Sequence, residues 1–214
     1  MGRRALRKID PAVDLSLHLA RLDDLTPPWC DEALFPQPAP LEIEVGSGKG
    51  LFLVTAAMAR PETNFLGVEV RRKYAEYTAG RLARRDQANA RMIHDDALRL
   101  FAEMLPSDHL AAVHVYFPDP WWKARHRKRR VMNEAFLLDI QRTLLAGAAL
   151  HFWTDVEEYF QTTLELIAGK TQLQGPLDVL EKTAEHDMDY RTNFERRKRM
   201  NGLEIYRAEF RKAT

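Results

Sequence analysis

The sequence predicts an α/β fold in which one parallel sheet carries helices on both faces. From residue 41 onward, short apolar runs of strand length alternate with longer segments of helical character. Such alternation is typical of parallel strands joined by crossover helices. Acidic residues also stand at or just after the ends of five of these runs. In a parallel sheet those positions share one edge, and ligands bind at that edge.

The first expected strand, residues 41–45, runs into the sequence GSGKG at 46–50 and then into an apolar stretch at 51–59. This order predicts a strand, a tight glycine turn and a helix. Glycines let the backbone approach a ligand, and the new helix offers unpaired N–H groups. A Walker loop is excluded because Gly50 stands where Ser or Thr is needed. The dinucleotide fingerprint Gly-x-Gly-x-x-Gly fits only in part, because residue 51 is Leu.

A second acidic residue supports a nucleoside ligand at this turn. The next expected strand, residues 64–70, carries Glu69 near its carboxyl end. A carboxylate about 20 residues beyond such a glycine turn accepts hydrogen bonds from the hydroxyls of a ribose. Glu69 is therefore the predicted ribose ligand.

The remaining elements can be placed in chain order. Helices are expected at 72–85, 98–105 and 133–146, and strands at 90–94, 111–117, 149–153, 177–183 and 204–210. Asn133 is the expected cap of the helix at 133–146. A capping box from Thr154 to Glu157 is expected to open one more helix, which ends near 168. Residues 1–40 contain six prolines and a basic start. We expect them to form a flexible N-terminal arm, with residues 41–214 as a single domain.

The five acidic residues at the expected strand ends should converge along one rim of the sheet. They are Glu44, Glu69, Asp96, Asp119 and Asp155. Asp119 lies in Phe-Pro-Asp-Pro-Trp-Trp at 117–122, where two prolines stiffen the loop. A tryptophan beside it is suited to stack on a base.

Composition limits the class of protein. With 214 residues and 45% hydrophobic content, the chain is long enough for one domain with a sizeable core. No apolar run approaches the ~20 residues that span a bilayer, and the basic N-terminus lacks a hydrophobic signal core. A single cysteine, Cys30, excludes an internal disulfide framework and a cysteine-based zinc site. We expect a cytoplasmic protein without a metal site.

The distribution of charge points to a polyanion. Net charge is only +1, yet three segments, residues 3–8, 123–130 and 191–199, hold almost half of the 32 Lys and Arg residues. Aromatic residues accompany the last two segments. Clustered cations on a near-neutral protein indicate a nucleic-acid-binding face. The expected phosphate contacts are Arg125, Arg127, Lys128, Arg129, Arg130, Arg196 and Arg197.

Taken in order, these motifs resemble the bacterial tRNA (guanine-N7-)-methyltransferase family. The resemblance rests on Glu44 with the glycine turn, on FPDPWWKARHRKRR at 117–130, on WTD at 153–155 and on TNFE at 192–195, and it covers roughly residues 40–210. Trp122 departs from the pattern, which has proline or a polar residue there. The resemblance implies a Rossmann-like class I methyltransferase fold, with a mostly parallel seven-stranded sheet whose last strand is antiparallel.

The resemblance also implies an activity and a set of site residues. The activity is transfer of a methyl group from S-adenosylmethionine to N7 of a guanine in tRNA, guanine 46 of the variable loop, giving 7-methylguanosine. Cofactor contacts fall on Glu44, Gly46, Gly48, Glu69, Asp96 and Asp119, with Asp119 also catalytic. Contacts to the RNA substrate fall on Lys123, Asp155, Thr192, Asn193, Phe194 and Glu195. The expected partner is tRNA, with no membrane and no obligate protein partner, in a monomer or homodimer.

Three other classes stay open on the residues alone. A nicotinamide oxidoreductase shares the fold but leaves the basic loops and the glycine spacing unexplained. A noncatalytic RNA-binding protein leaves the acidic rim unexplained. A methyltransferase acting on another RNA or on a protein is disfavoured only by the family resemblance. The histidines His94, His114, His126 and His151 are expected to be structural or to face phosphate.

Overall fold

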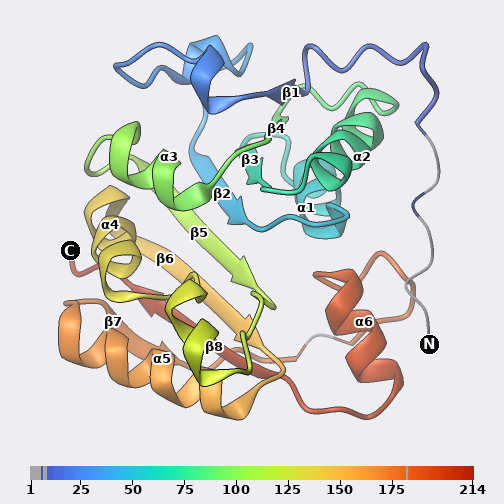
Figure 1. Cartoon of the computed structure of the whole chain (residues 1–214). Coiled ribbons are helices and arrows are strands. Elements are labelled where there is room, and N and C mark those ends of the chain that lie inside the picture. The colour runs from blue at the N-terminus through green and yellow to red at the C-terminus, as the bar shows by residue number, and fades with distance from the viewer. Residues whose placement is uncertain (1–5, 7–8, 182) are drawn as a thin grey trace.

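The computed structural model describes residues 6, 9–181 and 183–214, and this part of the chain is built around one eight-stranded sheet (Figure 1). In spatial order the strands are β1 (Leu19–Ala20), β4 (Ala90–Ile93), β3 (Asn64–Val68), β2 (Leu41–Val45), β5 (Leu110–Tyr116), β6 (Leu144–Thr154), β8 (Tyr206–Arg211) and β7 (Gln174–Leu177). Neighbouring strands from β1 to β6 are parallel, whereas β8 is antiparallel to both β6 and β7. The predicted fold class is confirmed, including the antiparallel last strand.

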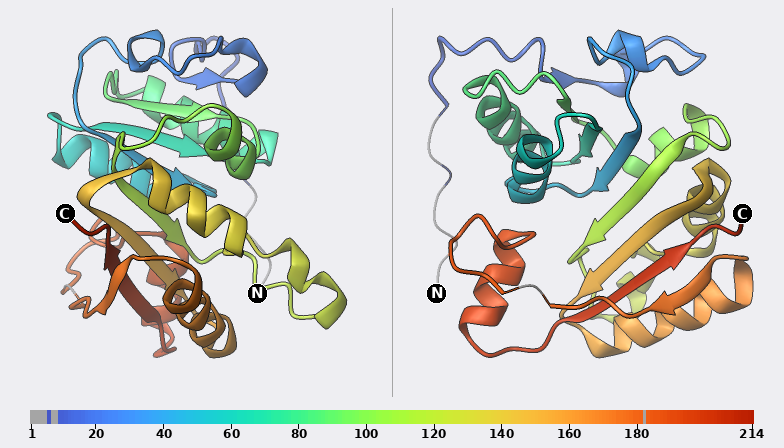
Figure 2. Two further views of the ribbon diagram at one scale, coloured as in Figure 1. Left: turned by 90° about the vertical axis from the view of Figure 1, so that its left-hand side faces the viewer. Right: turned by 180° about the vertical axis from the view of Figure 1, so that it is seen from behind.

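Helices cover both faces of the sheet, as Figure 2 shows from two further sides. The α-helices are α1 (Leu51–Ala59), α2 (Arg72–Ala83), α3 (Ala97–Glu103), α4 (Glu134–Thr143), α5 (Glu157–Lys170) and α6 (Asn193–Met200), and the short 3₁₀ helices are η1 (Leu22–Asp24), η2 (Asp31–Ala33) and η3 (Ala124–Arg129). Residues of α1 and α2 build one hydrophobic cluster, and residues of α3, α4 and α5 build the other. Two clusters on opposite faces are what a sheet between two helical layers requires.

The central strands are fully buried, which explains why the sequence predicted them. Every residue of β2 and β3 is buried, as expected for parallel strands with both faces covered. Two of the buried residues of β2 are acidic, Glu42 and Glu44. The Glu42 carboxylate accepts hydrogen bonds from Arg60 at 2.5 Å and contacts His114 Nε2 at 2.9 Å. Burial alone would raise the pKa of Glu42, but the hydrogen bonds from His114 and Arg60 outweigh it and lower the pKa to about 2. Glu42 and His114 thus form a satisfied polar pair in the core.

Most element boundaries differ from the sequence prediction by a few residues, and three differences are larger or concern a cap. The strand expected at 149–153 is longer, because β6 begins at Leu144 directly after α4. The strand expected at 177–183 is β7, which ends at Leu177. The capping box expected at Thr154 is wrong: the N-cap of α5 is Val156 with no side-chain hydrogen bond, and Thr154 remains paired in the sheet opposite Tyr206.

The eighth strand comes from the segment expected to be an arm. Leu19 and Ala20 add to the edge of the sheet beside β4, so the sheet has eight strands instead of seven. Leu22, Leu34 and Phe35 are buried in the larger hydrophobic cluster. The described part of this segment therefore packs on the domain, and the division of the chain at residue 40 stays a prediction. Within the described residues, no helix combines the length and apolarity of a membrane span.

Candidate functional site

The glycine turn lies between β2 and α1 and has a left-handed backbone at three positions. The φ angles of Gly46, Gly48 and Gly50 are 77°, 53° and 63°. A Cβ at Gly50 would overlap the buried side chain of Thr78 in α2, so this glycine allows close packing of the helix. A Cβ at Gly46 would meet no heavy atom within 4 Å, and at Gly48 only the Gly46 carbonyl oxygen at 3.9 Å. Two of the three glycines therefore border open space.

Helix α2 also fixes the turn through hydrogen bonds. The hydroxyl of Thr78 donates to the Gly48 carbonyl oxygen at 3.1 Å. The guanidinium of Arg81 donates to the Lys49 carbonyl oxygen at 2.6 Å. The carbonyls of the turn are thus held by α2, and the backbone is rigid before any ligand arrives.

Glu69 follows β3 and reaches the glycine turn. Its carboxylate accepts hydrogen bonds from the Gly48 N–H at 2.9 Å and from the Arg71 N–H at 2.8 Å. Each carboxylate oxygen has two lone pairs, so one acceptor position on each oxygen remains for a hydroxyl donor. This geometry suits the two hydroxyls of a ribose, the role predicted for Glu69 from its spacing.

Glu44 lies beneath the turn and is buried. One of its carboxylate oxygens, Oε2, has no hydrogen-bond partner among the described residues. Burial raises the pKa of Glu44 to about 8. A buried acceptor without a donor is costly, and a cationic or N–H donor would relieve it. The open glycines, the acceptors on Glu69 and the orphaned oxygen on Glu44 together fit a nucleoside that carries an ammonium group, as S-adenosylmethionine does.

The acidic rim expected from the sequence is confirmed as an arrangement. Glu44 is the penultimate residue of β2, and the other four acids follow β3, β4, β5 and β6, which are parallel neighbours. Their states differ, however. Asp96 caps α3 by accepting from the Leu98 N–H at 2.9 Å, and Asp155 pairs with Lys198 of α6 at 2.5 Å. Asp119 is exposed on its loop.

The loop that carries Asp119 is constrained at both ends. Phe117 and Trp121 have φ angles of 51° and 47°, a conformation that is uncommon for aromatic residues. The ring of Phe117 stacks on Phe194 of α6 with centroids 6.0 Å apart. Backbone strain of this kind clusters at functional sites, where the surrounding structure holds it. The predicted rigidity of the loop thus has a physical basis in these contacts.

Arg130 corrects one of the predicted phosphate contacts. Its guanidinium is buried, donates to the Pro120 carbonyl oxygen at 2.8 Å, pairs with Glu158 of α5 at 2.6 Å and lies 4.4 Å from the Tyr159 ring centroid. All of these contacts are internal, so Arg130 anchors the Asp119 loop to α5 and is not placed to bind RNA.

The other cations of this segment lie on or beside η3. Lys123, Arg125, Lys128 and Arg129 are exposed, as is Arg127, which pairs with Glu158 at 3.3 Å. The two tryptophans differ in environment. Trp121 packs against the Arg129 guanidinium at 5.0 Å, whereas 69% of Trp122 is exposed. The predicted cationic face is thus accompanied by an exposed ring.

The segment TNFE at 192–195 forms the start of α6. Thr192 Oγ1 accepts from the Glu195 N–H at 3.0 Å, and Glu195 accepts from the Arg191 N–H at 2.6 Å. Thr192 thus caps α6 with its side chain, as expected for Thr154 in α5, although Glu195 accepts from the residue before the N-cap and not from the N-cap itself. Glu195 is buried and pairs with Arg199 and Arg207, each at 3.5 Å. The contacts show what holds Thr192 and Glu195 in place; their predicted role toward RNA stays a prediction.

The remaining predicted residues of α6 differ in their exposure and contacts. Phe194 is 41% exposed despite its stacking on Phe117, and Arg197 lies 4.5 Å from its ring centroid. Arg196 pairs with Asp187 at 2.7 Å. Asn193 is the first residue of the helix. The helix therefore brings the ring of Phe194, with Arg197 over it, beside the Asp119 loop.

Sequence reasoning gave no specific role to Arg191, which it counted only within a run of cations. The structure places its guanidinium 5.7 Å from the Phe52 ring centroid and 5.9 Å from that of Trp153. Those residues lie in the first turn of α1 and near the end of β6. No local pattern in the sequence could have brought these three residues together.

Comparison with known proteins agrees with this geometry. Residues 38–208 match a family model described as "Putative methyltransferase". A tRNA (guanine-N(7)-)-methyltransferase from Rhodopirellula baltica is 49% identical over 218 residues, covering 99% of this chain and 80% of the relative. The enzyme of the same name from Cupriavidus necator is 38% identical over 212 residues, covering 98% and 78%.

Solved structures add a likeness of fold. The 16S rRNA methyltransferase KamB has a TM-score of 0.63 at 16% identity, covering 86% of this chain and 93% of that chain. The antibiotic-resistance methyltransferase Kmr has a TM-score of 0.58 at 15% identity, covering 91% and 98%. At such identities the likeness concerns the architecture of the sheet and its helices.

Proposed function

The chain belongs to the tRNA (guanine-N7-)-methyltransferase family. From that premise we propose which of its residues, at the edge of the sheet where the parallel strands end, bind the cofactor, the guanine and the RNA. The protein is an enzyme that methylates N7 of a guanine in tRNA. The finer proposal is that S-adenosylmethionine is the donor, that guanine 46 of the variable loop is the acceptor, and that Asp119 lies where the two meet. The observation that carries it is the position of the Asp119 loop on the same rim as the Glu69-bound glycine turn.

The cofactor residues are assigned by their hydrogen-bonding capacity. Glu69 takes the ribose hydroxyls with its remaining lone pairs, and Gly46 and Gly48 leave room for close approach of the nucleoside. Glu44 supplies its unpartnered oxygen to the ammonium group. Asp96 keeps one carboxylate oxygen outside its capping bond and borders the adenine.

The reaction requires no general base before N7 attacks the methyl group. Guanine N7 carries a lone pair and no proton, so no residue has to remove a proton before attack. S-adenosylmethionine, when bound, supplies a sulfonium methyl group, which forms a bond to N7 as its bond to sulfur breaks. The residues of the rim hold the guanine in line with that methyl group, and Asp119 faces the positive charge that develops on the base.

The RNA contacts are proposed for residues of two segments, one that follows Asp119 in the chain and one at the start of α6. Lys123 and the cations Arg125, Arg127, Lys128 and Arg129 belong to the first segment, with the exposed ring of Trp122 among them. The second segment holds Asn193, Phe194, Arg196 and Arg197, with Thr192 and Glu195 at its start and Asp155 tied to it through Lys198. Cations interleaved with exposed rings suit phosphates and unpaired bases.

The experiment that tests the function is direct. The protein is incubated with methyl-labelled S-adenosylmethionine and unmodified tRNA, and the nucleosides are then analysed. We expect label in 7-methylguanosine, and none when the tRNA carries adenine at position 46. Label in another nucleoside, or undiminished labelling of the altered tRNA, would contradict the acceptor assignment.

Replacement of Glu69 by Gln should weaken the binding of S-adenosylhomocysteine by about 10- to 100-fold, because charged hydrogen bonds contribute roughly 1.5–3 kcal/mol. Glu69 also holds Gly48 and Arg71, so part of the loss is a change in the turn itself. A 2′,3′-dideoxyribose analogue separates the two effects in isothermal titration. The analogue should lose much less affinity than S-adenosylhomocysteine, and Glu103→Gln, an exposed carboxylate of α3, should affect neither. Equal losses of affinity for both ligands would show that Glu69 does not bind the ribose.

Neutralising the two exposed cations Arg125 and Lys128 with Gln should weaken tRNA binding and flatten its salt dependence. The slope of log affinity against log salt should fall by up to ~0.7–0.9 for each phosphate that the variant no longer binds. Binding of S-adenosylhomocysteine should not change. The matched control is Arg84→Gln with Arg85→Gln, two exposed cations that follow α2 and remove the same charge. An equal change of slope in both double variants would mean that net charge alone acts on the RNA.

A further inference from the structure

Arg191 is a partly buried cation without an anionic partner. Among the residues that the structure describes, no carboxylate lies within ion-pair distance of its side chain. Its neighbours are the rings of Phe52 and Trp153, which are 1% and 5% exposed. Arg191 is only partly buried, and two aromatic faces replace only part of the hydration that its guanidinium loses there. The position therefore favours binding of an anion.

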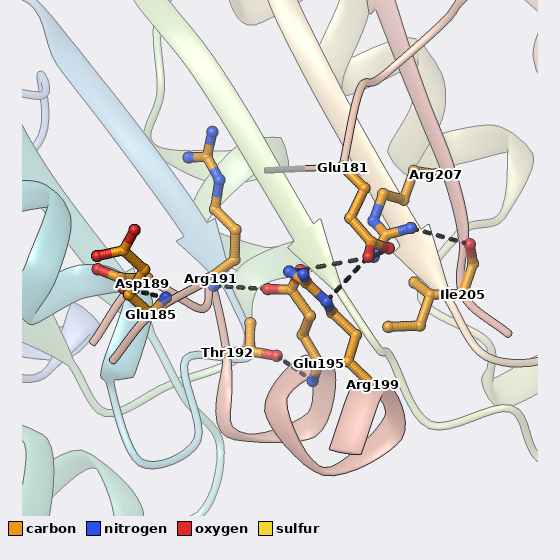
Figure 3. A network of polar contacts seen from close by, with 9 residues as sticks. All are labelled: Glu181, Glu185, Asp189, Arg191, Thr192, Glu195, Arg199, Ile205 and Arg207. Carbon is orange, nitrogen blue, oxygen red and sulfur yellow. Dashed lines mark hydrogen bonds and ion pairs between the residues drawn. The ribbon is translucent and has the colours of Figure 1, made fainter. Parts of the chain in front are cut away.

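The backbone at Arg191 is held by a network that leaves the side chain out. Glu195 accepts from the Arg191 N–H and is itself fixed by Arg199 and Arg207. Figure 3 shows this network, with the Arg191 side chain extending away from it. Glu181 closes the network from the other side through Arg199 and Arg207. Four charged groups thus hold one backbone amide in place, and the guanidinium it carries remains available to a ligand.

The charge of Arg191 acts on two histidines of the neighbouring strands β5 and β6. Burial is the main cause of the lowered pKa of His114 in β5, and the positive charge of Arg191 lowers it further. The same two causes, with the charge of His114, act on the pKa of His151 in β6. Glu42 opposes both shifts, so the observation shows only that the guanidinium of Arg191 lies close enough to act on these two strands through its charge.

Two further groups define the shape of the expected ligand. The ring that Arg191 contacts belongs to Phe52, the second residue of α1, which is the helix that follows the glycine turn. Glu44, on the strand that precedes the same turn, offers the unpartnered carboxylate oxygen. The Glu44 carboxyl, whose pKa burial raises to about 8, would ionise when an ammonium group binds beside it. Arg191 and Glu44 would then match a zwitterion, the form that an α-amino acid has at neutral pH.

We propose that Arg191 binds the carboxylate at the amino-acid end of S-adenosylmethionine, opposite Glu44, which takes the ammonium group. The inference rests on the proposed donor. An RNA phosphate is the less suitable anion here, because phosphate contacts come from exposed cations such as those of η3, whereas Arg191 is partly buried and lies beside two buried rings. Arg191 is thus a specificity residue that distinguishes the whole cofactor from a bare nucleoside thioether.

The test compares ligands that differ only in the amino-acid end. S-adenosylhomocysteine, its decarboxylated amine and 5′-methylthioadenosine are titrated calorimetrically into the wild type, Arg191→Gln and Arg191→Lys. We expect Arg191→Gln to lose about 10-fold or more in affinity for S-adenosylhomocysteine and to bind the other two ligands as the wild type does. Arg191→Lys should recover part of the loss because it keeps the charge. Arg21→Gln, an exposed arginine beside β1, is the control for the substitution itself.

Each outcome decides the proposal. Equal losses for all three ligands would show that Arg191 only shapes the site. Unchanged affinity for S-adenosylhomocysteine, together with weaker tRNA binding and a smaller salt slope, would assign Arg191 to the RNA instead. Failure of the wild type to bind any of the three ligands would overturn the donor, which is a failure of the proposed function and is distinguishable from the others. A thermal unfolding curve for each variant confirms that the fold is retained.

Discussion

Replacement of Asp119 by Asn is expected to slow the methyl-transfer step by about 10²–10³-fold, as for loss of one preorganised electrostatic stabiliser. The variant keeps the shape of the side chain and removes the negative charge that faces the developing positive charge on guanine. Because the strained loop is held by Phe194 stacking and by Arg130, its backbone should not depend on the Asp119 carboxylate. The measurement is single-turnover methylation at saturating tRNA and cofactor.

The affinities for tRNA and S-adenosylhomocysteine should change far less than the rate. Asp108→Asn is the matched control, since Asp108 is an exposed aspartate that precedes β5, whereas Asp119 follows it. The wild-type pH–rate profile should show no essential base near neutrality, because N7 needs no deprotonation. Near-equal single-turnover rates for the wild type and Asp119→Asn would move the electrostatic role to another acid on the rim.

Replacement of Gly48 by Val should reduce the affinity for S-adenosylhomocysteine by about 100-fold, which corresponds to ~2.8 kcal/mol at 1.4 kcal/mol per decade. The residue has a φ of 53°, and the left-handed region is strongly disfavoured for a β-branched side chain. Relief of that strain, of order 1–3 kcal/mol, would turn the Gly48 N–H away from Glu69. The added side chain would also fill the open space that the ligand needs.

The fold should survive this change, because a Cβ at Gly48 meets no atom closer than 3.9 Å. Gly202→Val is a close control: Gly202 also has a left-handed φ, 61°, and open space around its Cβ, but it follows α6. Both variants carry similar backbone strain, and only Gly48→Val should lose cofactor. Retained binding by a folded Gly48→Val protein would show that the nucleoside does not lie against this turn.

The sequence predicted the central strands and helices well, because these strands are short runs of mostly apolar residues and that pattern is local. The capping box shows where local pattern fails. Thr-x-x-Glu occurs at 154–157 and at 192–195, and only the second opens a helix by side-chain capping. Thr154 stays in β6 because its partner Tyr206, fifty-two positions later, extends the ladder to that residue. Pairing over that separation cannot be read from four residues.

The positions of the acidic site residues were predicted from the sequence, but their contacts and burial were not. Acids at the ends of parallel strands had to share one rim, and they do. The sequence could not show that Asp96 caps α3, that Asp155 is paired with Lys198, or that Glu44 is buried with an unpartnered oxygen. It also treated Arg130 as equal to its neighbours in a cationic run. A glutamate of α5 and the Tyr159 ring turn that side chain inward, and both lie almost thirty residues away.

The contact between Gly50 and Thr78 limits how this enzyme can be recombined with its relatives. The glycine turn is shaped from outside, by a side chain of α2 against Gly50 and by two donors of α2 to its carbonyls. A chimaera that imports residues 46–50 alone would set a foreign turn against the resident Thr78 and Arg81. The exchangeable unit is therefore the segment from β2 through α2, and libraries that vary the turn should vary positions 78 and 81 with it.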